Sequence, residues 1–151
     1  MTNIKEVSGG VCAPQGFRAG GICCGIKASS KKRDLALIYS EKPCTARAMF
    51  TSNKVKAACI QVTQEHLGPG PQGSGGILRA VIVNSGNANA CTGEAGLLAA
   101  RKMAHLAADL FAIDPKQVAV ASTGVIGVPL PPLFKPFARF GIFRIMPRTF
   151  N

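Results

Sequence analysis

Short apolar runs, separated by glycine-rich and polar stretches, divide the chain into several predicted elements. Alternating or continuous apolar character is typical of β-strands when turn-forming residues bound it. This pattern predicts strands at 34–40 (DLALIYS), 46–51 (ARAMFT), 57–63 (AACIQVT), 77–83 (ILRAVIV, the strongest) and 117–122 (QVAVAS). Residues 13–34 are rich in glycine, which predicts turns and close backbone approach there rather than a long element. Residues 68–76 (GPGPQGSGG) predict a surface loop.

One helix is predicted after the strongest strand. Thr92 is a suitable N-cap, and Glu94 in the first turn suits the helix dipole. Apolar residues then recur at spacings of three and four and form a single face: Leu97, Ala100, Ala104, Ala107 and Phe111. Its many alanines predict close packing on a sheet, and residues 113–115 (IDP) end it.

This order of elements, several strands followed by a helix and a last strand, predicts an α+β layered domain rather than alternating βαβ units. A length of 151 residues suits one domain or one half of a larger one. No apolar stretch approaches the ~20 residues that span a bilayer, and the start (MTNIKEVSGG) does not have the pattern of a secretory signal. We therefore expect a cytoplasmic protein.

The composition changes abruptly at Pro131. Residues 131–151 hold five of the eight phenylalanines and four basic residues, with no acidic residue. One interpretation is a segment that binds a partner or a membrane surface. The other interpretation, which we favour, is translation in a shifted reading frame. Pro136 and Pro147 interrupt any helix, and the sequence of the tail follows no pattern typical of a folded segment. We therefore divide the chain into a domain at 1–130 and a divergent tail at 131–151.

Cysteine and charge are less informative. The six cysteines form no C-x-x-C, and neither His66 nor His105 lies at zinc-finger spacing from them, which favours reduced, packed thiols over a metal site. The net charge of +11 could attract nucleic acid or anionic surfaces. Aromatic residues make up only 6% of the chain and no RNA-stacking motif is present, so charge alone does not decide the function.

Two motifs could carry chemistry. Residues 84–93 (NSGNANACTG) lie between a strand and a helix, where the asparagines either approach a ligand or bond their own backbone; the residues alone favour the second reading. Residues 122–127 (STGVIG) end a strand. There the Thr123 hydroxyl and the Gly124 N–H could both donate to the oxyanion of an acyl transfer. Cys91 has no histidine near it in sequence, and Ser85 lacks the G-x-S-x-G pattern of a nucleophile.

Taken together, these stretches resemble the bifunctional ornithine acetyltransferase (glutamate N-acetyltransferase) family. The resemblance covers roughly residues 13–131 and rests on APQGFRAGGICCGIK, DLALIYSEKPCTARAMFTSNKVKAA, RAVIVNSGNANACTGEAG and VAVASTGVIGVPLP. The two specific signatures are NSGNANACTG and ASTGVIG.

The resemblance implies a reaction, a fold and a partner. Family members transfer acetyl from N-acetylornithine to glutamate in arginine biosynthesis, and some accept acetyl-CoA. Their precursor cleaves itself before a threonine that becomes the nucleophile, and the α and β chains stay together as α2β2 in an αββα layered fold. No metal or tightly bound cofactor is implied. The oxyanion hole of the family carries over to Thr123 and Gly124.

The chain departs from the family pattern after Leu130-Pro131. The family's cleavage motif, an alanine-methionine stretch leading into a threonine pair, does not occur, and Thr149 stands in a different context. We therefore expect an α-chain-like part, one incomplete half of the fold, without a nucleophile and inactive alone; its substrate-binding residues are not assigned. The alternative is a small basic module that binds RNA or anionic surfaces.

Overall fold

The computed structural model describes residues 5–27, 31–70 and 73–131. Its elements, in chain order, are η1 (Gly10–Cys12), β1 (Phe17–Ile22), β2 (Leu35–Ala48), α1 (Ala58–Leu67), β3 (Pro69–Gly70), β4 (Gly73–Asn87), α2 (Gly93–Phe111), η2 (Pro115–Gln117) and β5 (Val118–Val125). The tail lies outside the described residues from residue 132 onward, and both interpretations of it stay predictions.

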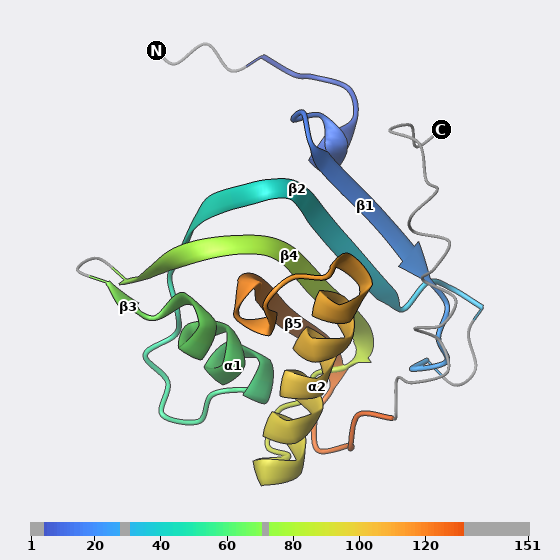
Figure 1. Ribbon diagram of the computed structural model, residues 1–151. Coiled ribbons are helices and arrows are strands. Elements are labelled where there is room, and N and C mark those ends of the chain that lie inside the picture. Colours follow the sequence, from blue (N-terminus) through green and yellow to red (C-terminus); the bar gives the residue numbers. More distant parts are fainter. Residues whose placement is uncertain (1–4, 28–30, 71–72, 132–151) are drawn as a thin grey trace.

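The described strands form one mixed sheet with β4 at its centre. β2 pairs with β4 on one side and with β1 beyond it, while β3 and β5 pair with β4 on its other side. Every pairing is antiparallel except β4 with β5, which are parallel and are joined through α2 (Figure 1). The predicted α+β class is confirmed. The expectation of no βαβ unit is wrong at one place, because β4, α2 and β5 form one.

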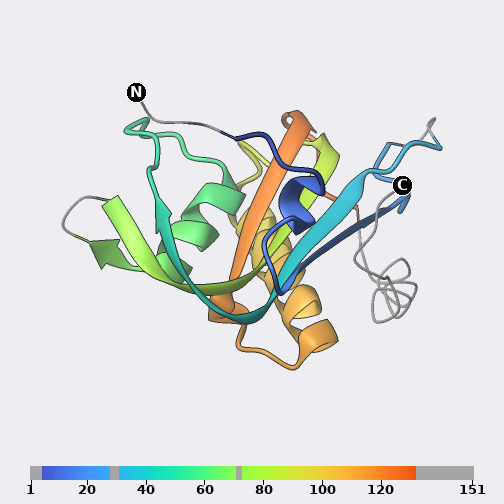
Figure 2. The same ribbon diagram turned by 90° about the horizontal axis from the view of Figure 1, so that it is seen from above.

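β2 is a single long strand where the sequence predicted two. The register against β4 shifts between Tyr39 and Cys44, which marks a β-bulge. Pro43, which has no N–H to donate, lies in this irregular stretch. The residues that interrupt the alternating pattern form this bulge, so the strand bends there and continues (Figure 2).

Two glycine-rich segments are more regular than predicted. The segment 13–34 contains β1, in which Gly20 and Gly21 pair with Leu37 and Ala36. The predicted loop at 68–76 contains β3 and the start of β4, which pair with each other. Backbone hydrogen bonds to a neighbouring strand offset the low strand propensity of glycine in both segments.

The predicted strand at 57–63 is wrong, because these residues belong to helix α1. Its buried residues recur at helical spacing: Ala58, Cys59, Val62, Thr63 and Leu67. Gly68 follows with φ 67° and ψ 171°, a backbone conformation that glycine adopts much more easily than other residues. The β-branched residues suggested a strand, but packing on the sheet outweighs that weak propensity.

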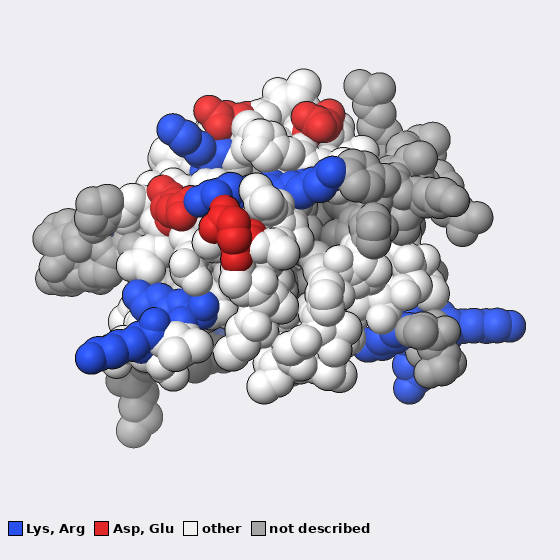
Figure 3. Space-filling view, turned by 90° about the horizontal axis from the view of Figure 1, so that it is seen from below, with Lys and Arg blue, Asp and Glu red and all other residues white. Residues whose placement is uncertain are grey.

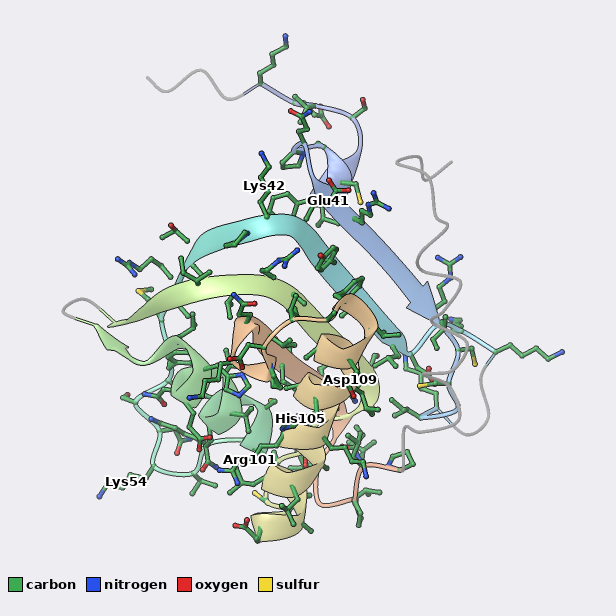
Figure 4. The ribbon with its side chains drawn as sticks, viewed as in Figure 1. Glu41, Lys42, Lys54, Arg101, His105 and Asp109 are labelled. Carbon is green, nitrogen blue, oxygen red and sulfur yellow. The ribbon has the colours of Figure 1, made fainter. Side chains whose placement is uncertain are left out.

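Helix α2 confirms the prediction for its region. Ala100, Ala104 and Ala107 are fully buried against the sheet, with Leu97 and Phe111 packed at the margin of the core. The core lies between one face of the sheet and both helices. Arg101, His105 and Asp109 lie along the outer side of α2 (Figure 4). Within the described residues, neither helix has the length and apolar character needed to cross a bilayer.

Candidate active site at the carboxyl ends of β4 and β5

The parallel pairing of β4 with β5 brings the two sequence motifs side by side. The register aligns Asn84 with Ser122, Ser85 with Thr123 and Gly86 with Gly124. Both segments lie at the carboxyl ends of their strands, the edge where parallel sheets usually bind ligands. The two motifs are far apart in the sequence, so this juxtaposition is a property of the fold.

The backbones of the two motifs approach each other at a pair of glycines. Gly86 and Gly124 have φ values of 109° and 135°, which L side chains rarely adopt. A Cβ on Gly124 would lie 2.3 Å from the carbonyl carbon of Gly86 and 2.5 Å from the nitrogen of Asn87. Position 124 therefore requires glycine both because of its backbone conformation and because there is no space for a side chain.

The three asparagines of the first motif are buried and bonded to backbone. Asn84 donates to the carbonyl of Asn87 at 2.8 Å, and Asn89 donates to that of Gly96 at 3.0 Å. The side-chain oxygen of Asn87 accepts from the N–H of Asn89 at 2.8 Å. The structure therefore supports the interpretation in which these asparagines bond to the backbone of their own loop rather than to a ligand.

Thr92 stands at the N-cap of α2, but its side chain does not cap the helix. Its hydroxyl donates instead to Asn89 Oδ1 at 2.8 Å. The predicted cap is thus correct in position and wrong in its hydrogen bond. Gly96 makes this arrangement possible, because a Cβ there would lie 1.9 Å from Thr92 Oγ1.

The same loop holds the end of the second motif. The N–H of Ala88 donates to Val125 O at 2.8 Å, and the Asn87 side chain donates to Val128 O at 2.7 Å. The N–H of Gly127 donates to Ala90 O at 3.3 Å. These bonds fix the segment after Thr123 and Gly124 against the first motif.

Thr123 itself is available to a ligand. It is exposed, and its hydroxyl makes no hydrogen bond to another described residue. Beside it, Ser122 Oγ and the Asn84 Oδ1 opposite are buried without a partner in the described part of the chain. Sequence reasoning selected the motif that contains Ser122, Thr123 and Gly124, but it did not predict that Asn84 and Gly86 lie beside it. The assignment of Thr123 and Gly124 to an oxyanion hole stays a prediction.

A small cavity of about 210 Å³ lies where the two motifs meet at the start of α2. Its lining is largely apolar and combines both motifs: Cys91, Thr92, Ala95, Gly96, Ala99, Gly127, Pro129 and Leu130. Thr123 and Gly124 do not line it.

Cys91 is exposed at this cavity, and neither histidine of the chain is hydrogen-bonded to it. His66 bonds through Nδ1 to the carbonyl of Val118 at 2.7 Å, and His105 lies on the outer side of α2. None of the six cysteines forms a disulfide within the described residues. That part of the chain also brings no three potential metal-binding side chains together.

Basic side chains do not form one continuous surface on the face shown in Figure 3. Lysine and arginine gather in separate groups there, and acidic side chains lie among those of the upper group. Among the ion pairs of the described residues, Arg101 pairs with Glu65 at 3.2 Å. This distribution gives no support to the basic binding module.

The fold and the paired motifs define an α+β protein with a candidate site at the carboxyl ends of parallel strands. The chain belongs to the ArgJ family, whose model matches residues 18–133, more than half of its length. The family resemblance identified from the motifs is thereby confirmed.

Relatives and solved structures agree with this assignment. The chain is 50% identical over 129 residues to the arginine biosynthesis bifunctional protein ArgJ of Symbiobacterium thermophilum, covering 85% of this chain and 31% of that protein. It is 51% identical over 118 residues to the protein of the same name from Thermotoga neapolitana, covering 78% and 28%. The chain therefore spans less than a third of the length of these curated relatives.

Two crystal structures share the fold. The ArgJ protein of Bacillus halodurans superposes with a TM-score of 0.76 at 41% identity, covering 95% of this chain and 71% of that one. The ornithine acetyltransferase of Mycobacterium tuberculosis, solved in complex with ornithine, gives a TM-score of 0.73 at 45% identity, covering 87% and 68%.

Proposed function

We propose that this chain is the oxyanion-binding, non-nucleophilic part of a glutamate N-acetyltransferase, which transfers acetyl from N-acetylornithine to glutamate in arginine biosynthesis. The observation that carries the proposal is the pairing of the Thr123–Gly124 and Gly86 backbones in a member of the ArgJ family, with an exposed Thr123 hydroxyl that bonds to no other described residue. The ornithine in the Mycobacterium tuberculosis structure supports the substrate class.

The proposed chemistry is acyl transfer through a covalent intermediate. A threonine hydroxyl from a second segment attacks the acetyl carbonyl, and the carbonyl oxygen becomes an oxyanion that accepts from Thr123 and Gly124. The C–N bond then breaks, and ornithine leaves with the proton that a base removed from the threonine. The amine of glutamate attacks the acetyl-enzyme by the reverse sequence of steps. No metal or bound cofactor takes part in this scheme, and acetyl-CoA is the alternative donor to assay.

The second segment is expected to supply the nucleophile, since residues 1–151 include no family-like cleavage motif. The crystallised Bacillus halodurans chain is much shorter than a complete curated relative, since this chain covers 71% of the first and 31% of the second. That difference supports a family in which the precursor is divided into two chains. We propose a β chain as the partner, in an α2β2 assembly, located in the cytoplasm as the biosynthetic role suggests.

We also propose that the second segment completes an αββα sandwich. Both helices cover one face of the sheet, and the opposite face carries apolar residues that are partly buried, Ile38, Val81, Val83 and Ala121, and one that is exposed, Ala36. Strands that are apolar on both faces are typical of sheets buried on both sides. A second sheet against this face would bury it.

A chimera tests the proposed function. Residues of this chain replace the matching segment of the Symbiobacterium thermophilum relative, which then supplies the remaining two thirds of the protein. The folded chimera should transfer acetyl from N-acetylornithine to glutamate, while the 151-residue chain alone should not. A chimera that folds and assembles yet shows no transfer, or turnover by the purified chain alone, would contradict the proposal.

A further inference from the structure

Asp34 is a buried residue at the end of the sheet that carries the candidate site. It is 2% exposed and directly precedes β2. Its N–H donates to Ile22 O at 3.0 Å, and its carbonyl accepts from Ser85 N at 2.8 Å. Asp34 therefore connects the end of β1, the start of β2 and the part of β4 that holds the first motif.

The carboxylate of Asp34 organises the loop that follows β1. Its two oxygens accept from the N–H groups of Cys24 at 2.7 Å and Lys27 at 3.1 Å. Burial raises the pKa of the Asp34 carboxyl, but these donors outweigh it and hold the pKa below its usual value. Burial and the neighbouring carboxylate raise the pKa of the Cys24 thiol to about 12, so it stays a neutral donor to Asp34. The loop is thus held by a charged acceptor with several donors.

The loop held in this way lies directly against Gly86. A Cβ on Gly86 would lie 2.7 Å from Lys27 Cγ and 3.3 Å from Ile26 Cγ2. Gly86 in turn lies against Gly124, at the close approach described above. Contacts therefore run without a gap from the Asp34 carboxylate, through the loop and Gly86, to Gly124.

We propose that Asp34 is a positioning residue for the oxyanion site: it holds residues 24–27 against Gly86 and thereby fixes the backbone on which Gly124 presents its N–H. The inference rests on the proposed function. Asp34 does not contact the substrate, since its carboxylate is buried and occupied by backbone donors. Without this carboxylate, the loop, Gly86 and Gly124 shift together. A misplacement of about 1 Å in a catalytic donor costs on the order of 10²-fold in rate.

Hydrogen exchange in the 151-residue chain tests the positional link without any assay of activity. Asp34→Asn keeps the size of the side chain but removes its charge and one acceptor oxygen. We expect amides at 24–27, at 84–87 and at 122–126 to exchange at least about tenfold faster, with the amides of α2 unchanged. Faster exchange confined to 24–27 would overturn the proposal, because Asp34 would then stabilise only its own loop.

Asp114→Asn is the matched control. Asp114 also accepts a backbone N–H, from Lys116 at 2.8 Å, but it does so at the start of η2, before the other end of β5. It should leave exchange at 84–87 and 122–126 unchanged. If Asp34→Asn does not fold, Lys27→Ala tests the same link, because it removes the contact of Cγ with Gly86 and keeps the N–H that Asp34 binds. Unchanged exchange at 84–87 and 122–126 in Lys27→Ala would then overturn the proposal.

Kinetics of the chimera provide the second arm. Asp34→Asn should lower kcat by about 10-fold to 10²-fold with KM within about twofold, because the donors act mainly in the transition state. Asp114→Asn should leave both constants unchanged. An active chimera with an unchanged kcat in Asp34→Asn overturns the positioning role and leaves the proposed function intact. A parent chimera that folds and assembles but is inactive instead contradicts the proposed function. Hydrogen exchange then still tests whether Asp34 positions Gly86 and Gly124.

Discussion

Gly124 and Gly127 stand in the same motif and both have positive φ values, 135° and 75°. Their surroundings differ. A Cβ on Gly124 would meet the backbone of Gly86 and Asn87, while a Cβ on Gly127 would meet nothing within 4 Å. Only Gly124 is therefore required by packing as well as by conformation.

This difference predicts unequal effects of the same substitution. Gly127→Ala should lower the free energy of unfolding by about 1–2 kcal/mol, the usual cost of a left-handed conformation for an L residue. Gly124→Ala should cost about 3 kcal/mol or more, because β4 and β5 must also separate. Urea unfolding of the two variants measures the difference. If both variants lost the same free energy of unfolding, the close approach of β4 and β5 at Gly124 would not contribute to stability.

Thr123 allows a test of the oxyanion assignment in the active chimera. Thr123→Ala should lower kcat by about 10²–10³-fold with little change in KM, since a donor of this kind acts mainly on the developing charge. Thr123→Ser keeps the hydroxyl and should retain much of the rate. If Thr123 only stabilises its own turn, Thr123→Ala would lower the melting temperature and leave kcat per folded molecule unchanged, which would remove it from the site.

At the scale of elements, the sequence predicted what depends on local pattern. The apolar face of α2 and the continuous run in β4 follow from periodicity alone. The helix at Ala58–Leu67 was missed because Ile60, Val62 and Thr63 mimic an alternating strand, and only its contacts with the sheet and with α2 define its buried side.

The candidate site was predicted as two separate motifs for a related reason. Thr123 and Gly124 could be selected from their residue types and the family resemblance. Their neighbours Gly86 and Asn84 depend on the parallel register of β4 and β5, which is a non-local pairing with no signal in either segment.

Helix α1 also bonds to β5, which pairs with no described strand other than β4. Thr63 Oγ1 donates to Val120 O and accepts from Val120 N, both at 2.9 Å, and Thr63 is 9% exposed. Thr63→Val has a similar shape but leaves both backbone groups of Val120 without this partner. We expect a loss of about 1–3 kcal/mol in the free energy of unfolding.

Thr45→Val, at an exposed position of β2, is the control and should stay within about 0.5 kcal/mol of wild type. Chemical denaturation measures the free energy of unfolding of the two variants. Similar stability in both would show that the Thr63 bonds only replace equivalent bonds to water.

On the scale of the whole molecule, α1 and α2 cover the same face of the sheet, and the other face, which neither of these helices covers, is called the uncovered face below. Leu37, Ile82 and Val118 are fully buried beneath the helices. Ile38 and Val81, which are paired across β2 and β4, are only partly buried on the opposite face. This one-sided arrangement is the one expected for the proposed αββα sandwich, in which a second sheet would bury the apolar outer face.

This asymmetry predicts that a charge on the uncovered face disrupts assembly rather than folding. Val81→Lys should change the free energy of unfolding of the chain alone by no more than about 1 kcal/mol, because the lysine can reach solvent from a partly exposed position. In the proposed assembly the same ammonium would be buried between two sheets without a partner, at a cost of several kcal/mol.

The measurement is co-purification of this chain with the remaining segment of the Symbiobacterium thermophilum relative, followed by size-exclusion chromatography. Val81→Lys should remain folded but fail to form the complex that the wild-type chain forms. Leu98→Lys is the control, since Leu98 is 58% exposed on α2, away from this face, and its complex should form normally. If Val81→Lys assembles as well as Leu98→Lys, the second segment does not cover this face, and the αββα arrangement proposed for the complete enzyme is wrong.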